Sequence, residues 1–299
     1  MSTTHALSDL ESKASSRTAF TRADVDRVVG CPDLVSVGVL GAASRKALHG
    51  ARVTFGRVAL VEAGVAPAER GESGEVRITG APVSPEQAIE WTRTAAAWAG
   101  AGATVTGFAL HELDRIAGHD HIVLCELARA LQASGLSGVA EIAIDQMGED
   151  PGEVVRAVLH GGLFAKRATI TVAPFETRLD LIERAVALQK DTKALAAFAP
   201  LPRVDPVDAP STGYDDVKTI VAARLMATSI PHIQVDWALY GPKLAQVAIE
   251  YGADDIDAVS ATDIERMGAR RSPKQDIERQ IRSAFAEPAE RTGRYEITA

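Results

Sequence analysis

Residues Val221–Val259 read VAARLMATSIPHIQVDWALYGPKLAQVAIEYGADDIDAV, two successive repeats of a helical segment followed by a strand. The pattern predicts helices near 213–228 and 240–251, and strands near 231–236 and 254–259. A helix between two strands returns the chain to the same edge of a sheet, so the strands run parallel. This stretch therefore predicts an α/β protein built on a parallel sheet.

The same alternation extends toward the N-terminus. Ser84-Pro85-Glu86-Gln87 has the serine cap, first-turn proline and glutamine spacing that begin a helix. Capping-box spacing recurs at Thr21–Asp24, Thr177–Asp180 and Ser260–Asp263. Further strands are expected near 53–61, 103–110, 138–144, 167–173 and 195–200, and further helices near 33–48, 84–98, 121–134, 150–160 and 178–192. This series of alternations predicts a full or partial (β/α) TIM-like barrel with crossover helices, with a doubly wound open sheet as the alternative.

No linker divides this pattern. The polar start, residues 1–20, predicts a flexible N-terminus, and residues 21–299 are expected to form one barrel domain with a C-terminal helical extension. Residues 62–83 combine glycines and charges with few apolar side chains, so they are expected to form a loop. The sequence is compatible both with a loop that fills the ligand site expected in such a barrel and with a loop that covers this site as a lid.

The composition narrows the class of partner. The 299 residues carry a net charge of −8, which argues against nucleic acid or an anionic membrane as the main partner. No apolar run reaches the roughly 18 residues that span a bilayer, and the first residues lack the apolar segment of a signal peptide. We therefore expect a cytoplasmic protein. The two cysteines, Cys31 and Cys125, are too far apart in the chain for a disulfide framework or a zinc motif.

A barrel of this kind carries its functional residues at the C-terminal ends of the strands. Polar residues expected there are Glu62, His111, Glu112, Asp145, Glu176, Asp205, Asp236 and Asp257. They could line a polar ligand pocket, although acidic residues are also common in turns and in first helical turns. The histidines and carboxylates between positions 111 and 121 match no recognised ligand spacing, so no metal site is predicted.

Glu141 lies inside the strand predicted near 138–144, where a barrel would bury its side chain or point it inward. A buried carboxylate without a partner is costly, which favours either a ligand or a structural hydrogen bond.

Two more groups are candidates for ligand contact. Gln234, Asp236 and Trp237 end a predicted strand, and an aromatic ring beside an amide and a carboxylate suits a nucleoside-like ligand. Core packing is the alternative for Trp237. Asp254 and Asp255 follow a glycine, and one of them is expected to accept hydrogen bonds from the backbone of the turn, which leaves the other as a site candidate.

Several blocks of the C-terminal half follow one known pattern. Val221–Trp237 matches A-x-x-R-L-x-L-x-N-I-P-H-I-x-x-x-W, and Gly241–Asp257 matches G-x-K-L-A-Q-x-A-L-x-x-G-A-D-D-L-D. Gly138–Ile144 is similar to a G-G-G-A-E-I strand, and Phe175–Thr177 to the end of G-H-x-E-T. Through these blocks the chain resembles the aminofutalosine synthase and dehypoxanthine futalosine cyclase group, menaquinone-biosynthesis radical S-adenosylmethionine (SAM) enzymes related to the FO synthases. The resemblance implies a barrel, a link to the futalosine pathway, and contact of Glu141 with a nucleoside hydroxyl.

The departures from that family concern its cofactors. Where the family places three cluster-binding cysteines after its first strand, this chain has VALVEAGVAPAER, residues Val58–Arg70. The family's G-G-L-H-P stretch is missing, which suggests that one strand–helix unit is deleted or fused. The Gly-Thr that follows G-A-D-D-L-D in the family is Ala258-Val259 here. A [4Fe–4S] cluster requires several thiolates brought together. We therefore expect no iron–sulfur cluster and no radical chemistry, and these departures argue against SAM binding.

Three functions follow from the resemblance and its departures. The first is a cluster-free pseudoenzyme of the futalosine pathway that binds a nucleoside-type intermediate, or pairs with a radical SAM paralogue or with itself. The second is a non-radical enzyme acting on a futalosine-like nucleoside, with carboxylates as acid and base. The third is an assembly or structural protein. The catalytic candidates are Glu141, Asp145, Glu176 and Asp236, and the ligand-binding candidates are Glu141, Glu176, Gln234, Asp236, Trp237, Asp254 and Asp255.

Overall fold

The computed structural model of the chain describes residues 7–69, 71–204, 209–261 and 274–298. Eight parallel strands form its centre, and the pairing of the first with the last closes them into a barrel. These strands are β1 (Arg52–Glu62), β2 (Glu75–Thr79), β3 (Val105–Ala109), β4 (Gly138–Ala143), β6 (Arg167–Ile170), β7 (Ala197–Pro200), β8 (His232–Asp236) and β9 (Asp255–Ser260). The predicted TIM-like barrel is confirmed, and the open sheet is excluded by the β1–β9 pairing.

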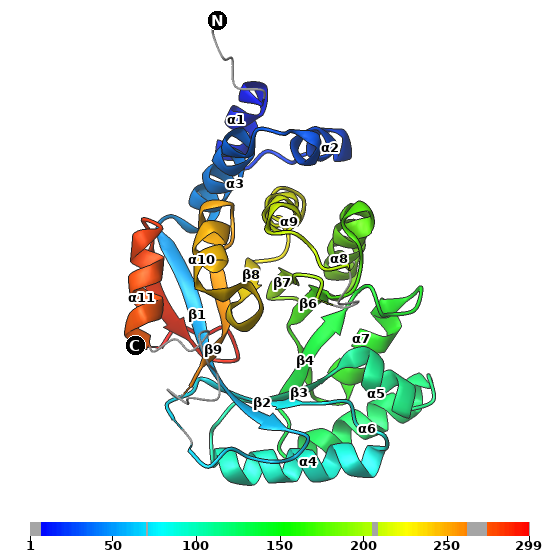
Figure 1. Cartoon of the computed structure of the whole chain (residues 1–299). Coiled ribbons are helices and arrows are strands. Elements are labelled where there is room, and N and C mark those ends of the chain that lie inside the picture. The colour runs from blue at the N-terminus through cyan, green and yellow to red at the C-terminus, as the bar shows by residue number, and fades with distance from the viewer. Residues whose placement is uncertain (1–6, 70, 205–208, 262–273, 299) are drawn as a thin grey trace, which may run out of the picture.

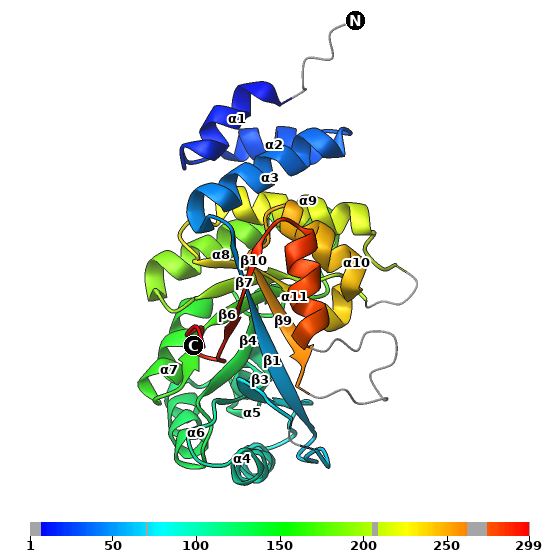
Figure 2. The same ribbon diagram turned by 90° about the vertical axis from the view of Figure 1, so that its left-hand side faces the viewer.

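Helices surround this barrel (Figure 1). They are α1 (Ser8–Ser15), α2 (Arg22–Gly30), α3 (Leu34–His49), α4 (Pro85–Ala99), α5 (Leu110–Ile116), α6 (His121–Ala133), α7 (Pro151–His160), the 3₁₀ helix η1 (Phe175–Thr177), α8 (Arg178–Thr192), α9 (Gly213–Met226), α10 (Trp237–Glu250) and α11 (Lys274–Ser283). Figures 1 and 2 both show α1–α3 outside the ring, where α2 and α3 pack against α9 and α1 packs against α3. The segment expected to be flexible thus contains α1, whose Leu10 and Ala14 are buried. Among the described helices, none is both long and apolar enough to cross a bilayer.

The sequence signals for helix starts hold in two of the four cases. Ser84 accepts a hydrogen bond from the Gln87 N–H at the start of α4, and Thr21 forms the predicted capping box of α2. The predicted box at Thr177 is wrong, because its hydroxyl donates to the carbonyl of Pro174 and does not cap α8. The box expected at Ser260–Asp263 extends outside the described residues.

The prediction of a loop over residues 62–83 is wrong in part, because β2 lies within it and pairs with both β1 and β3. The barrel therefore has eight strands, one more than the seven predicted from the sequence. The described residues between β1 and β2 contain no helix. Glu75 and Arg77 obscured the strand, since charged residues are rare in a strand that is buried on both faces.

The strands direct polar side chains inward and apolar ones toward the helices. On β8, Ile233 and Val235 pack in the hydrophobic core, whereas Gln234 bonds to Asp255 on the neighbouring strand β9, on the inner face of the barrel. The main hydrophobic core therefore lies between the barrel wall and the helices. The interior itself is available for charged groups.

The C-terminal segment closes the N-terminal end of the barrel. Helix α11 leads into a further strand, β10 (Glu287–Arg291). Strand β10 pairs with the first half of β1, and β2 pairs with the second half of β1. A two-residue strand, β5 (Phe164–Ala165), extends the sheet beside β4.

Candidate active site in the barrel

A network of ion pairs fills the barrel interior. Arg291 Nε and Nη2 donate to the two oxygens of Asp255 at 2.6 and 2.7 Å. Asp257 Oδ2 lies 2.8 Å from Arg77 Nη1 and 2.6 Å from Arg167 Nη1. Although burial opposes ionisation, these three guanidinium groups hold the pKa of Asp257 well below its usual value. The network is therefore ionised, and it forms a fixed floor.

A cavity of about 510 Å³ opens above this floor, at the C-terminal ends of the strands. We call it the barrel cavity. Its charged or titratable lining residues are Arg77, His111, Glu112, Glu141, Arg167 and Asp236. Its position is the one where enzymes with this barrel bind their substrates.

Arg167 and Glu141 face each other in this cavity. Arg167 Nη2 lies 3.6 Å from Glu141 Oε2, which also receives the hydroxyl of Thr169 at 3.4 Å. Within the described part of the chain, Arg167 Nε has no hydrogen-bond partner although it is buried. Both residues thus keep capacity for a further partner, a donor on Arg167 and an acceptor on Glu141.

His111 and Glu112 approach the cavity from the start of α5. Glu112 Oε2 accepts the Ala109 N–H at 3.3 Å, and burial raises the pKa of Glu112. His111 Nδ1 is buried and lacks a hydrogen-bond partner among the described residues. This nitrogen therefore keeps its hydrogen-bonding capacity at the edge of the cavity.

Asp236 completes the polar wall. Its Oδ1 accepts the N–H groups of Ala238 and Leu239 and so caps α10. Burial, followed by the nearby charge of Asp257, raises the pKa of Asp236. Of the catalytic and ligand-binding candidates chosen from the sequence, Glu141 and Asp236 line this cavity, together with His111 and Glu112, which were expected at the ends of the strands.

Two predicted carboxylates lie outside the lining of the barrel cavity. Asp145 Oδ2 accepts the N–H groups of Thr171, Val172 and Ala173 at 2.7–3.0 Å and holds the loop after β6. Glu176 is exposed on η1. Asp205 lies outside the described residues.

Gln234, Asp255 and Trp237 are buried. Gln234 Nε2 donates to Asp255 Oδ2 at 2.7 Å and to the Tyr295 hydroxyl at 2.8 Å, below the cavity floor. Trp237 is 1 % exposed and packs in the hydrophobic core. A role of these residues in ligand contact stays a prediction.

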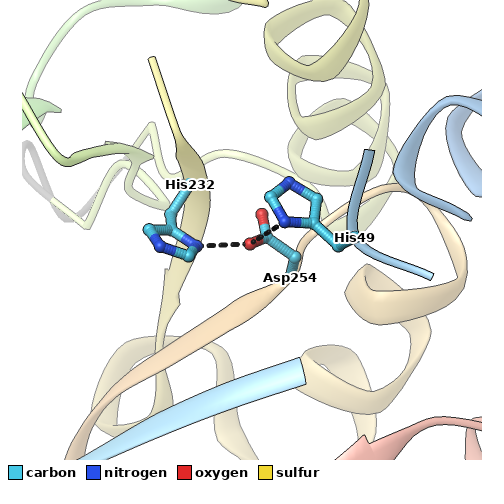
Figure 3. Close-up of side chains that lie close together, drawn as sticks. All are labelled: His49, His232 and Asp254. Atoms are coloured by element: carbon cyan, nitrogen blue, oxygen red, sulfur yellow. Dashed lines mark hydrogen bonds and ion pairs between the residues drawn. The ribbon is translucent and has the colours of Figure 1, made fainter. Parts of the chain in front are cut away.

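A second titratable cluster lies at the opposite, N-terminal end of the barrel. Figure 3 shows His49 and His232 pointing at Asp254, which directly precedes β9. The Nδ1 atoms of His232 and His49 lie 2.5 and 3.4 Å from Asp254 Oδ2. Asp254 Oδ1 accepts the Ile233 N–H, as expected of one carboxylate in this turn, and also pairs with Arg224.

This cluster forms a closed set of hydrogen bonds. Arg224 Nη1 lies 3.3 Å from His49 Nε2, which accepts, so the proton of neutral His49 is on Nδ1 and faces Asp254. Burial lowers the pKa of His49 to about 4. Burial opposes the charge on His232, but Asp254 outweighs it and raises the pKa of that imidazole. A metal ion would have to displace a proton from both imidazoles, so the geometry indicates an ion-pair network.

The two cysteines lie away from the barrel cavity. Cys31 is buried at the end of α2, and Cys125 is on α6. Neither is among the residues that line the described cavities. The side chains at the C-terminal end of the barrel therefore supply oxygen and nitrogen donors, which do not fit a cluster held by thiolates.

Sequence reasoning missed Arg77, Arg167 and Phe108, which also line the cavity. Arg77 lies in the strand that was mistaken for a loop. Arg167 begins a predicted strand but was not selected as a site residue. Phe108 has a φ of 63°, unusual for a bulky residue.

No protein-family model matches the chain. It is 31% identical over 141 residues to the aminodeoxyfutalosine synthase of Streptomyces coelicolor, covering 40% of this chain and 36% of that protein. It is 24% identical over 209 residues to the cyclic dehypoxanthine futalosine synthase of the same organism, covering 62% of this chain and 52% of that protein. The chain thus spans about a third to a half of these curated relatives.

The solved structures support the fold. The crystal structure of methylornithine synthase (PylB) aligns with a TM-score of 0.66 at 12% identity, over 94% of this chain and 97% of that one. The maturase HydG from Carboxydothermus hydrogenoformans aligns with a TM-score of 0.63 at 10% identity, over 95% of this chain and 79% of that one. The sequence relatives confirm the resemblance predicted from the sequence, to the group of aminofutalosine synthase and dehypoxanthine futalosine cyclase.

Proposed function

We propose that this protein binds a nucleoside-type intermediate of the futalosine pathway in the barrel cavity, without an iron–sulfur cluster. The names of its relatives support the association with that pathway. The observation that carries the proposal is the pairing of Arg167 and Glu141 at the cavity floor: Arg167 Nε has no hydrogen-bond partner among the described residues, and Glu141 keeps accepting capacity beyond its contacts with Arg167 and Thr169.

The lining suits a ligand with hydroxyl groups and a flat ring. Glu141 can accept from a ribose hydroxyl, and Arg167 Nε can donate to a carbonyl or carboxylate. The Phe108 ring lines the cavity and stacks on Trp91, with ring centroids 6.4 Å apart. Its strained backbone is consistent with a position fixed for contact with a ligand.

The absence of cluster chemistry is part of the proposal. The loop after β1, where the related enzymes carry their cysteines, contains none, and both cysteines of the chain lie on other elements. Radical chemistry belongs to the cluster and to SAM, so we assign no radical step to this chain. Pairing with a radical SAM paralogue is compatible with this role and can be tested by co-purification.

One observation favours acid–base catalysis as a second candidate function. Glu112 and Asp236 have raised pKa values and line the same cavity as Glu141. A protonated carboxyl and a carboxylate facing one ligand can act as acid and base. Turnover of a bound nucleoside, lost in Glu112→Gln, would support this function over binding alone.

The test is thermal denaturation with aminofutalosine, dehypoxanthine futalosine, adenosine and SAM. A futalosine-type nucleoside at about 100 times its dissociation constant should stabilise the protein by about 2.7 kcal/mol, which raises Tm by about 4 °C for a chain of this length. SAM should give no shift. Glu141→Gln should weaken nucleoside binding about tenfold, because the amide accepts hydroxyl protons less strongly than a carboxylate.

Glu126→Gln is the matched control, because Glu126 is exposed on α6 outside the cavity. Equal affinity in the Glu141 and Glu126 variants would contradict the assigned recognition. An unchanged Tm with every nucleoside at saturating concentration would refute the proposed function.

A further inference from the structure

The guanidinium group of Arg167 belongs to both sides of the cavity floor. Arg167 lines the barrel cavity, and it also lines a small space of about 20 Å³ beneath the floor, to which Tyr295 contributes as well. On the cavity side, its Nη2 atom lies 3.6 Å from Glu141. Its Nη1 atom is held by Gln234 and Asp257. The place of this group in the cavity is therefore set by partners that belong to the floor.

Gln234 meets Arg167 through an amide whose orientation is determined. Its Nε2 donates to Asp255 Oδ2 at 2.7 Å and to the Tyr295 hydroxyl at 2.8 Å. Its Oε1 then lies 3.4 Å from Arg167 Nη1. A carboxylate can only accept and a guanidinium can only donate, so a reversed amide would lose both contacts. Asp255 and Tyr295 thus direct the acceptor oxygen of Gln234 toward Arg167.

A second link joins Tyr295 to the same nitrogen atom. The Tyr295 ring lies over the guanidinium of Arg291, whose Cζ is 4.1 Å from the ring centroid. Arg291 Nη2 donates to Asp257 Oδ1 at 3.2 Å, and Asp257 Oδ2 accepts from Arg167 Nη1 at 2.6 Å. Both links therefore begin at Tyr295 and end at Arg167 Nη1.

Tyr295 is held in place by its turn and by the groups around its ring. Its φ of 63° is a left-handed conformation that is uncommon for a bulky residue. Its N–H donates to the Thr292 carbonyl at 3.1 Å, and its ring stacks on His232 with centroids 5.7 Å apart. Burial raises the pKa of the Tyr295 hydroxyl, which therefore stays neutral. A strained residue fixed by several contacts is typical of a functional position.

We propose that Tyr295 is a positioning residue, which sets the place of the Arg167 guanidinium in the barrel cavity. Its effect passes through Gln234 on one route, and through Arg291 and Asp257 on the other. Tyr295 does not line the barrel cavity, so it acts without touching the ligand. The inference rests on the proposed function, in which Arg167 contacts the ligand. It gives the C-terminal segment a part in recognition at the opposite end of the barrel.

The first measurement uses the protein without a ligand. With ¹⁵N-labelled arginine, the Nε–H resonance of Arg167 is assigned by its loss in Arg167→Lys. Tyr295→Phe removes the hydroxyl and keeps the ring, and it should shift this resonance. Tyr251→Phe is the matched control, because the Tyr251 hydroxyl donates to the Leu34 carbonyl at 3.0 Å, outside the network. The control should leave the Arg167 resonance in place.

The second measurement is isothermal titration calorimetry with dehypoxanthine futalosine. Tyr295→Phe should weaken binding about fivefold, which corresponds to the loss of one hydrogen bond, and Tyr251→Phe should not weaken it. When Arg167 is already replaced by lysine, Tyr295→Phe should cause no further loss. A general structural effect would instead persist without Arg167, and that result would overturn the inference.

The outcomes separate the inference from the proposed function. Nucleoside binding with an unshifted Arg167 resonance in Tyr295→Phe overturns the inference and leaves the nucleoside site standing. Unchanged affinity in Tyr295→Phe does the same. If the unmodified protein does not bind the nucleoside, the proposed function fails, and the resonance alone decides. A shift in Tyr295→Phe that is absent from Tyr251→Phe still supports the positioning role.

Discussion

The substitution Asp257→Asn tests whether the ion-pair network is the structural centre of the barrel. The carboxylate is 1 % exposed and lies 2.8, 2.6 and 3.2 Å from nitrogen atoms of Arg77, Arg167 and Arg291. Asparagine keeps the size of the side chain but removes its negative charge. The buried guanidinium groups of Arg77, Arg167 and Arg291 then have one carboxylate fewer to balance their charge. Removing one partner of a buried ion pair costs about 3–5 kcal/mol.

This cost can be measured as a shift in thermal stability. With about 2.1 cal/mol/K of unfolding entropy per residue, a chain of this length should lose about 5–8 °C in Tm. The matched control is Asp180→Asn, because Asp180 pairs with Arg22 but its side chain is 70% exposed. An exposed pair of this kind contributes less than about 1 kcal/mol. A loss below about 1 kcal/mol in Asp257→Asn would refute the reasoning, since it would mean that water replaces the carboxylate at little cost.

Two further substitutions have defined outcomes. The folded-state pKa of His49 is lowered to about 4, so the neutral imidazole favours the folded state above the unfolded pKa, and this stabilisation is lost as the pH falls toward 4. His49→Gln should therefore reduce the loss of unfolding free energy between pH 6.5 and pH 4 by about 3 kcal/mol. Urea titrations at both pH values measure it, and an unchanged pH dependence would contradict a buried neutral imidazole. Ala258→Gly should stabilise the protein by about 1 kcal/mol, because Ala258 has a φ of 56°, a left-handed conformation that glycine adopts without strain. A lower urea midpoint than that of the unmodified protein would show that the methyl group contributes packing that outweighs the strain.

The sequence predicted the elements whose signals are local. The helix at Ser84 has its cap and proline next to each other in the chain, and β8 and β9 alternate apolar and polar residues in the expected period. The strand Glu75–Thr79 also alternates, with Val76 and Ile78 facing outward, but its charged members suggested a solvated loop. Only the partners of Glu75 and Arg77, which lie far away in the chain, make this strand buried.

Only part of the candidate site was predicted, again because some of its contacts join residues that are far apart in the chain. Glu141 and Asp236 were selected because strand ends and inward positions can be counted along a sequence. Arg77 and Arg167 form ion pairs with Asp257, which lies at least 90 positions away in the chain. No local sequence pattern reveals such a pairing. The roles of Asp254 and Asp255 depend on Arg224 and Arg291 in the same way.

The position of Arg291 in the chain also constrains the order in which the barrel is completed. Strand β9 brings Asp255 and Asp257 into the interior, but the cation that pairs with both lies on β10. During synthesis at the ribosome, every barrel strand can emerge while this cation is still to be translated. The interior then holds more carboxylate charge than its arginines balance, so the barrel interior is neutralised only after all of its strands have been made.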